Sequence, residues 1–472
     1  MRVACVLLLL APGMPAADPA TKSATMGAIE KRRADLIRLS GDIWRYAETA
    51  LRETRSSAAL ADYAEKAGFR MERGVAGLPT AFVASYGEGK PVIGILAEFD
   101  ALPGISQKAS PVKEALEADA AGHGCGHNLF GVAALGAAIA LKEQIAAGKL
   151  KGTVKLFGTP AEESVYGKVW MIREGVFNGV DLMLVWHPAD ATRADMQSTQ
   201  ALVDFAVEFR GRTAHAALDP WNGRSAVDGL EAFTHGVNLL REHVRPSVRM
   251  HYAIQRGGDV PNVVPEYARV WCWARDSSRS GVEAVLARLR EIADGAAKIA
   301  GVESKFTIQT GCWERLVLAE GAKLLDANLR GIGPIAYTAE EQAFARAIQR
   351  ATGVAEKGLN SEIQPLEEQR RDPPGGSTDV GVVSWVTPTL HLSVATAPEG
   401  APWHAWPVVA AGGMSIGHKG MMLAAKTLAA TAVDLFEDAA ARDRISSEFA
   451  RKTRGVVYKG YIPSGPPPLP KN

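Results

Sequence analysis

Three features are missing from this sequence: an excess of charge of one sign, internal repeats, and an apolar run long enough to span a membrane. Because 53 lysines and arginines balance 52 aspartates and glutamates, there is no electrostatic footprint for nucleic acid or an anionic membrane surface. We therefore expect neither as a partner. The chain of 472 residues exceeds one compact core, so two domains of a soluble globular protein are expected.

The first residues have the pattern of a targeting segment. Arg2 supplies a positive start, residues 3–10 are apolar, and residues 14–17 are small enough for a cleavage region. The alternative, a buried N-terminal helix, is disfavoured because two prolines would break it. The pattern predicts a signal peptide over residues 1–17 and a periplasmic or secreted protein.

Cleavage of this segment would remove Cys5 and leave three cysteines, which cannot all pair. A disulfide between Cys272 and Cys312 is compatible with an oxidising compartment, but spacing alone does not establish it. The WCW stretch around Cys272 is typical of a buried strand. We therefore favour two free thiols.

Residues 24–200 alternate between helical patterns and apolar strands. The runs 91–100, 152–163 and 181–188 are almost continuously apolar, and residues 128–144 form a strong helical pattern. This alternation predicts an α/β fold with a mainly parallel sheet and helices on both faces. In such sheets, ligands bind at the carboxyl ends of the strands.

The pattern changes between residues 201 and 312. Strands such as 201–211 and 268–276 alternate apolar and polar residues, and two helices accompany them. Half-buried strands with helices on one face predict a small α+β domain, inserted into a larger one that resumes at residues 313–450. The proline-rich tail, residues 455–472, is expected to cross the surface in an extended form or to be disordered.

Metal-ligand side chains occur at a helix start. Cys125 and His127 lie two residues apart in GHGCGHNLFG, whose glycines allow close backbone approach. Thiolate and imidazole are preferred ligands of zinc. Taken alone, such a turn is more often structural. Further ligand-type residues at strand ends favour a metal site: His187 ends one buried strand, and His404 lies in PWHAW.

A pair of glutamates, Glu162 and Glu163, directly follows another buried strand. Adjacent residues in an extended loop point to opposite sides, so the two carboxylates can have different roles. One can bind a metal, while the other takes a proton from water whose pKa the ion has lowered. Solvated loop acids are the commoner fate of such a pair, but this position favours the catalytic interpretation.

Eight motifs follow one another in a specific order between about residues 28 and 440. They are AEFDALPG, GHGCGHNLFG, GTPAEE, WHP, GRTAHAALDPWNGRSAVDGLEA, PNVVPEYA, GSTDVG and PWHAW. The set resembles the zinc-dependent aminoacylase/carboxypeptidase family of metallo-amidohydrolases. Within that family it is most similar to the amidohydrolase branch of the aminobenzoyl-glutamate hydrolases.

The resemblance implies a catalytic domain with two divalent metal ions, zinc first and manganese as the alternative, and an inserted lid through which two chains form a homodimer. Glu162 corresponds to the catalytic base, and Asp100 to a catalytic-site aspartate beneath the metals. The implied metal ligands are Cys125, His127, Glu163, His187 and His404.

Two positions depart from the simplest form of the pattern. Other branches have a histidine ligand two residues before Asp100, where this chain has Glu98, so that ligand is absent. His418 is a rival to His404 for the last ligand. We favour His404, because His418 fits the start of a helix. Asp379 in GSTDVG is expected to support a ligand and not to bind metal itself.

Three residues of the inserted segment are expected to bind substrate. The resemblance gives His215 the role of reaching the neighbouring chain's active site and stabilising the oxyanion; the alternative is a histidine packed at a strand turn. Asn262 and Arg275 could hold a substrate carboxylate, the arginine through a bidentate fork. Arg275 could equally be an ordinary surface strand residue.

The expected function is hydrolysis of the amide bond of an N-acyl or aminoacyl amino acid. The substrate would be a small molecule with an amino-acid carboxylate, such as an aminobenzoyl-glutamate-like amide, another acyl-amino acid or a dipeptide. The alternative is a non-catalytic ligand-binding or regulatory subunit of the same fold. The presence of Glu162 and all five implied ligands argues against it.

Overall fold

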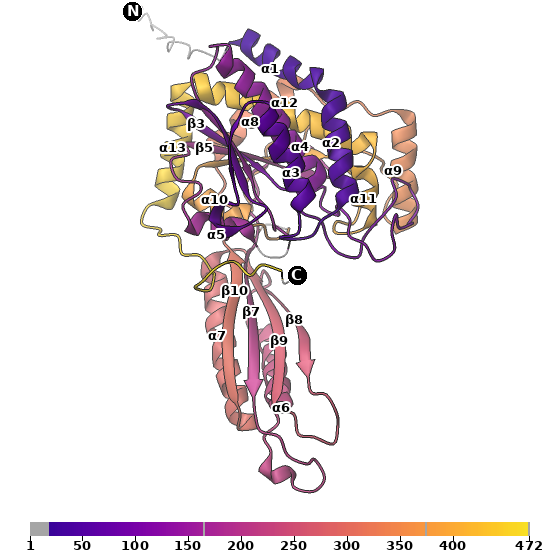
Figure 1. Ribbon diagram of the computed structural model, residues 1–472, viewed down its shortest axis with the longest axis vertical. Coiled ribbons are helices and arrows are strands. Elements are labelled where there is room, and N and C mark those ends of the chain that lie inside the picture. The colour runs from indigo at the N-terminus through magenta and orange to yellow at the C-terminus, as the bar shows by residue number, and fades with distance from the viewer. Residues whose placement is uncertain (1–17, 164–165, 373–374, 471–472) are drawn as a thin grey trace, which may run out of the picture.

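The computed structural model describes residues 18–163, 166–372 and 375–470. The predicted signal peptide, residues 1–17, therefore lies outside the described residues. Two sheets with separate hydrophobic cores make up the described chain. Residues 201–312, which we call the small unit, project from the remainder, the large unit, along the long axis of the molecule (Figure 1).

The sheet of the large unit has seven strands in the order β1-β2-β4-β3-β5-β11-β6. The strands are β1 (Arg70–Arg73), β2 (Phe82–Glu88), β3 (Val92–Ala97), β4 (Gly152–Gly158), β5 (Leu182–Ala189), β6 (Arg193–Ala194) and β11 (Thr389–Ala395). The four central strands, β4, β3, β5 and β11, are parallel. The α/β class is thus confirmed.

The edges of this sheet correct one detail of the prediction, because β1, β2 and β6 pair antiparallel. Only residues 89–91 connect β2 to β3. So short a connection reverses the chain, whereas parallel neighbours need a long crossover. Since β3 is parallel to β4, β2 must run antiparallel to β4. The mainly parallel sheet is therefore parallel only at its centre, which is where the buried strand ends lie.

Eleven α-helices accompany this sheet among the described residues. They are α1 (Pro19–Lys31), α2 (Arg33–Tyr46), α3 (Thr54–Lys66), α4 (His127–Ala146), α5 (Gly167–Arg173), α8 (Ala319–Ile332), α9 (Ala339–Thr352), α10 (Val380–Val386), α11 (Trp406–Gly412), α12 (Ser415–Glu437) and α13 (Ala439–Thr453). The helical pattern after residue 24 is divided into α1 and α2 at Arg32. The guanidinium of Arg32 donates a hydrogen bond to the Ala28 carbonyl at this break.

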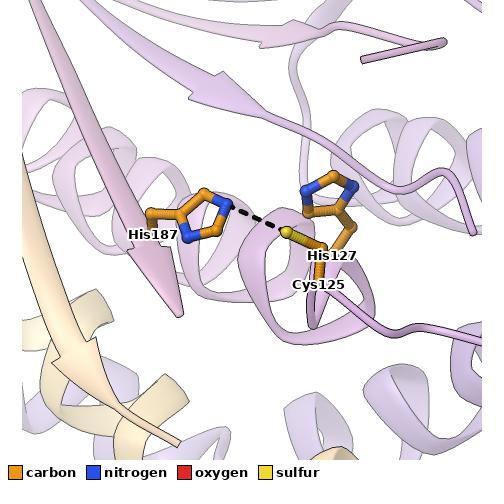
Figure 2. Close-up of side chains that lie close together, drawn as sticks. All are labelled: Cys125, His127 and His187. Atoms are coloured by element: carbon orange, nitrogen blue, oxygen red, sulfur yellow. Dashed lines mark hydrogen bonds between the residues drawn. The ribbon is translucent and has the colours of Figure 1, made fainter. Parts of the chain in front are cut away.

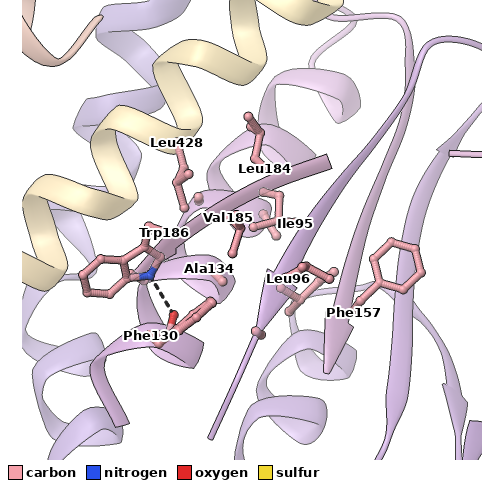
Figure 3. Packing of buried hydrophobic residues seen from close by; sticks show 14 of the residues in the cluster. Ile95, Leu96, Phe130, Ala134, Phe157, Leu184, Val185, Trp186 and Leu428 are labelled. Carbon is pink, nitrogen blue, oxygen red and sulfur yellow. Dashed lines mark hydrogen bonds between the residues drawn. The ribbon is translucent and has the colours of Figure 1, made fainter. Parts of the chain in front are cut away.

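Helices α4 and α12 lie side by side against the central strands. In Figure 3, Phe130 and Ala134 of α4 and Leu428 of α12 pack among side chains of β3 and β5. The indole of Trp186 donates to the Phe130 carbonyl at 3.1 Å, which fixes β5 against α4. α4 is apolar and long enough to cross a membrane, but 78% of its apolar window is buried inside the protein, as in a core helix.

The small unit is a four-stranded antiparallel sheet in the order β10-β7-β9-β8. Its elements are β7 (Ala201–Arg210), α6 (Ala226–Leu240), β8 (Arg249–Gly257), β9 (Tyr267–Asp276), α7 (Arg279–Ala300) and β10 (Glu303–Cys312). β9 alternates between buried and half-buried residues along its whole length, because only one face of the sheet is covered by α6 and α7. Leu202 lies opposite Cys312, so the chain enters and leaves the unit on neighbouring strands.

The cysteines of the small unit are free thiols, as the sequence favours. Strand β7 lies between β9 and β10, with Cys272 opposite Phe205 and Cys312 opposite Leu202. Two strand spacings of roughly 4.8 Å, with an additional offset of three residues along β7, separate the two thiols. This exceeds the reach of a disulfide, whose Cα atoms lie within about 7 Å.

The tail contains no helix or strand after Thr453 within the described residues and crosses the surface, one of the two predicted forms. Tyr461 packs against the hydrophobic cores of both units. Its hydroxyl donates to Glu283 Oε1 on α7 at 3.0 Å. The tail therefore connects the large unit to the small one (Figure 1).

Candidate metal centre and active site

The start of α4 brings the first two predicted ligands to the end of β5. Gly126 precedes the helix with φ 78°, a left-handed conformation that favours glycine. A Cβ at this position would lie 3.0 Å from the Pro188 side chain. The glycine thus allows Cys125 and His127 to approach β5 closely.

His187 is held with one ring nitrogen toward the sulfur of Cys125. Its Nδ1 lies 2.7 Å from the Pro188 carbonyl oxygen, which can only accept a hydrogen bond, so Nδ1 carries the proton. The Nε2 lone pair then faces the Cys125 Sγ at 3.4 Å (Figure 2). Fixing one nitrogen by a hydrogen bond is how proteins orient a metal-binding histidine.

His127, which is fully buried, is also oriented by a hydrogen bond at Nδ1. Its Nδ1 donates to Asp100 Oδ1 at 2.9 Å, and both residues are buried. Its Nε2 is a buried nitrogen without a hydrogen-bond partner and lies 3.2 Å from Glu98 Oε2. Asp100 therefore fixes which ring nitrogen of His127 faces Glu98, and its role beneath the metals stays a prediction.

His404 and Glu163 meet on the other side of Cys125. The His404 N–H donates to the Gly124 carbonyl at 3.0 Å, and a Cβ at Gly124 would lie 3.2 Å from His404 Cα. His404 adopts φ 55°, which is uncommon for a residue other than glycine and typical of functional positions. Its Nε2 lies 3.4 Å from Glu163 Oε2.

The five predicted ligands form two groups that share one sulfur atom. Cys125, His127 and His187 form one group and Cys125, Glu163 and His404 the other, with ligand atoms within 4.8 Å of one another. Thiolate, imidazole and carboxylate suit zinc or a similar divalent ion. The chemistry of these donors therefore fits two ions, and Cys125 could contribute to the site of either one. Within the described chain, His418 joins neither group, which favours His404.

Glu162 faces a different set of side chains from Glu163. It forms a third group with Glu98 and His127, all of them buried residues. The two adjacent glutamates thus have different partners, as expected from their opposite orientations. In the sequence, Glu98 stands out only because it replaces a histidine ligand of other branches. In the structure Glu98 is part of the buried site, and its contact with His127 could not be inferred from sequence spacing.

A buried lysine that no sequence motif identifies neutralises part of this charge. Lys168 is fully buried in α5, and its Nζ lies 2.7 Å from Glu98 Oε1 and 2.5 Å from Asp379 Oδ1. Although burial opposes it, these carboxylates hold the pKa of Lys168 above its ordinary value. Asp379 supports this lysine and, among the described residues, forms no hydrogen bond with a predicted ligand. Within the GKVWMIR segment the lysine has no pattern that distinguishes it from a surface residue.

The pKa values of the buried groups are shifted in directions that favour binding of a cation. Burial, together with the charges of Glu98 and Glu163, raises the pKa of Glu162 well above its ordinary value. Burial raises the pKa of Glu163 to about 7. Burial lowers the pKa of His187 to about 4, so its imidazole is neutral at physiological pH and free to bind metal.

A pocket of about 800 Å³ opens onto these groups. Its wall includes Cys125, Glu162, Glu163, His187, His404 and Arg275. Arg275 extends from β9 of the small unit, with its guanidinium over the ring of Trp273 and a buried Nε that has no hydrogen-bond partner. It is therefore a pocket residue and not an ordinary surface strand residue.

His215 and Asn262 are not part of this pocket's wall. Their loops meet at the far tip of the small unit, where Ala216 N–H donates to the Asn262 carbonyl (Figure 1). The exposed His215 accepts hydrogen bonds at Nδ1 from the N–H groups of Ala217 and Leu218. Its proton must then be on Nε2, which can donate to a partner outside the chain.

Buried parallel strand ends, two ligand groups around one thiol and a neighbouring carboxylate together define a metal-dependent hydrolase. The chain matches the model of Peptidase family M20/M25/M40 over residues 94–405, and it belongs to this family. The members of this family that it resembles are hydrolases acting on amide and peptide bonds.

Relatives support the assignment over nearly the whole length. The chain is 37% identical to one of the subunits of p-aminobenzoyl-glutamate hydrolase from Escherichia coli, over 94% of this chain and 98% of that protein. It is 28% identical to Xaa-Arg dipeptidase of Mus musculus, over 92% and 96%. A solved dinuclear metal-binding M20 peptidase from Bacillus subtilis has a TM-score of 0.57 at 20% identity, over 87% of this chain and 99% of that one, and shares the fold.

Proposed function

We propose that this hydrolase uses two divalent ions to cleave the amide bond between an acyl or aminoacyl group and an amino acid with a free carboxylate. The observation that carries the proposal is the pair of ligand groups sharing Cys125, with Glu162 beside them in the same pocket. The names of the relatives, an aminobenzoyl-glutamate hydrolase and a dipeptidase, support this substrate class.

The first ion would be held by Cys125, His127 and His187, and the second by Cys125, Glu163 and His404. When bound, the ions supply Lewis acidity that polarises a carbonyl and lowers the pKa of water. Zinc is the proposed metal, because the shared thiolate is a soft ligand; manganese is the alternative.

Glu162 is the proposed proton carrier. Its burial raises its pKa well above the ordinary value, which brings the carboxyl closer to the range in which a group can both take and return a proton. It would take the proton of the attacking water and deliver it to the departing amide nitrogen. Asp100 positions its neighbours, through the Glu163 N–H at 2.8 Å and the His127 ring.

The substrate carboxylate would bind Arg275. A guanidinium directed into the pocket, with no ion pair among the described residues, can form the bidentate fork that a carboxylate requires. Because Arg275 belongs to the small unit and the metal ligands to the large one, the substrate would lie between the units.

We further propose that residues 24–200 and 313–450 form the catalytic domain, that residues 201–312 form its lid, and that two copies pair through their lids. The support is the position of His215 and Asn262, which lie at an exposed tip with the His215 Nε2–H available as a donor. That donor would stabilise the oxyanion in the neighbouring copy, with Asn262 beside it. The word subunit in the names of two relatives indicates the competing possibility, a heteromeric assembly.

Export is also part of the proposal, on the pattern of residues 1–17. N-terminal sequencing of the protein from its native host would show cleavage near Ala17, and an intact Met1 in the active protein would contradict it.

The central test loads the purified protein with zinc or manganese and screens acyl-glutamates, acyl-aspartates and dipeptides by liquid chromatography. We expect two bound ions per chain and release of a free amino acid. Two ions without turnover of any amide would instead indicate a ligand-binding or regulatory subunit. Failure to bind metal would reject the proposal altogether.

A further inference from the structure

The loop that carries Glu162 contains a strained residue. Ala161, immediately before it, is fully buried and has φ 61°. A residue with a Cβ is strained in this left-handed conformation and persists there only where surrounding contacts enforce it. The contacts of the Ala161 backbone therefore determine where the Glu162 side chain is directed.

One of these contacts comes from a distant carboxyl group. Glu53, directly before helix α3, has no exposed surface, and its Oε1 accepts the Ala161 N–H at 2.9 Å. Its other oxygen, Oε2, accepts the Thr80 hydroxyl at 3.0 Å. An acidic side chain is almost never fully buried unless it has polar partners, because removing it from water is costly.

A second contact holds the loop on the other side of Glu162. Asp100 Oδ2 accepts the Glu163 N–H at 2.8 Å. The residues before and after Glu162 thus each donate their backbone N–H to a buried carboxyl group from a different part of the chain. The two hydrogen bonds hold the peptide unit before Ala161 and the peptide unit after Glu162. The carbonyl of the unit between them, that of Ala161, accepts the Tyr166 N–H at 2.7 Å. The loop is thus held on both sides of Glu162, whose side chain lies beside Glu98 and His127.

We infer that Glu53 is a positioning residue for Glu162: by holding the strained Ala161 peptide, it aims the carboxylate that moves the proton. The inference rests on the proposed function of Glu162. In the described chain Glu53 forms no hydrogen bond or ion pair with any of the five ligand residues, so its loss would affect proton transfer and not metal binding. What matters is the reach of its side chain and an acceptor oxygen at the end, not its charge.

Two substitutions separate reach from charge. E53Q keeps the length and an acceptor oxygen but removes the acid, and we expect kcat within about threefold of wild type. E53D keeps the acid but is one methylene shorter, so it cannot reach the Ala161 N–H. Because a displacement of about 1 Å in a catalytic group can cost on the order of a hundredfold, E53D should lose kcat on that scale. Its KM and its two bound metals should remain unchanged.

T80V is the matched control, since it removes the other hydrogen bond of Glu53 and leaves the Ala161 contact in place. We expect kcat within about threefold of wild type. Equal losses in E53D and E53Q, a loss in E53D that follows its metal content, or an unchanged E53D would each overturn the inference.

A readout that needs no catalysis separates this inference from the proposed function. Hydrogen exchange of the Ala161 amide should be faster in E53D than in wild type and E53Q. If no substrate were turned over by the wild type, the proposed function would fail while this measurement still tests the contact. Unchanged exchange in E53D would show that Glu53 does not hold the loop.

Discussion

The large and small units bury different kinds of side chains. Between residues 201 and 312, all of them described, the buried carboxylates are Asp204 and Asp276, and the core between sheet and helices is apolar. In the large unit, the carboxyl ends of the parallel strands gather buried acids, histidines and a lysine around one thiol. The small unit therefore has an apolar interior, whereas the large unit concentrates acidic groups in its interior, whose mutual repulsion a bound cation would relieve.

The largest effect should follow from E162Q, because this change removes the proposed proton carrier. Proton transfer by a positioned side chain contributes roughly 10²–10⁴-fold to the rate, so turnover should fall by several orders of magnitude. Bound metal, measured by elemental analysis, should remain at wild-type level. E163Q is the matched comparison and should lose metal. If E162Q lost metal in proportion to activity, the roles of the two glutamates would have to be exchanged.

Removing the buried lysine tests the difference between the units directly. K168M leaves Glu98 and Asp379 without their cation, and breaking a buried ion pair in this way costs about 3–5 kcal/mol. Urea unfolding of the metal-free protein would measure the loss. K298M, at an exposed position of α7 in the small unit, should change the free energy of unfolding by less than about 1 kcal/mol. Similar losses in both variants would contradict the comparison.

The tip of the small unit can be tested by mixing two inactive variants. H215A should bind metal and dimerise but lose on the order of a hundredfold in turnover, because an oxyanion donor is removed. Exchange of subunits with E162Q should restore about a quarter of wild-type activity, since half of the dimers are mixed and each has one complete site. No recovery despite demonstrated exchange would reject the shared site and leave the metal ligands unaffected.

A smaller effect concerns pH. The pKa of Glu163 is raised to about 7 and that of Glu53 to about 8, mainly by burial, so the folded metal-free protein retains these protons longer than the unfolded chain. Stability from a raised carboxyl pKa is lost as pH rises through the folded value. From pH 6.5 to 8.5, the free energy of unfolding should fall by about 2–3 kcal/mol. Adding zinc should reverse the trend, and E163Q should weaken it; a rise in stability over this range would contradict the electrostatic account.

The two units also differ in how much the sequence predicted. The strand expected at 201–211 is β7, Ala201–Arg210, and the strand expected at 268–276 is β9, Tyr267–Asp276. The alternating pattern matches the burial of β9 residue by residue, whereas β7, which lies between β9 and β10, is buried at nearly every residue and not at every second one. In the large unit, continuous apolar runs predicted the central strands but not the antiparallel edges.

The site was predictable only in part, for a physical reason. Motifs identified the five proposed metal ligands, because each has a distinctive local sequence. Glu53 and Lys168 have none, and their roles depend on contacts across 108 and 211 residues, with Ala161 and Asp379. Such long-range pairs follow from how the strands and helices pack and are not visible in local spacing.

The connection between the units has a mechanical consequence. The chain enters the small unit at the start of β7 and leaves it at the end of β10. Because these two connections lie on neighbouring strands, they restrain the small unit along one edge. The hydrogen bond of Tyr461 with Glu283 is made on α7 and not on these strands, so it restrains the small unit at a second place. Any displacement of the small unit that moves α7 away from the tail would have to break this hydrogen bond.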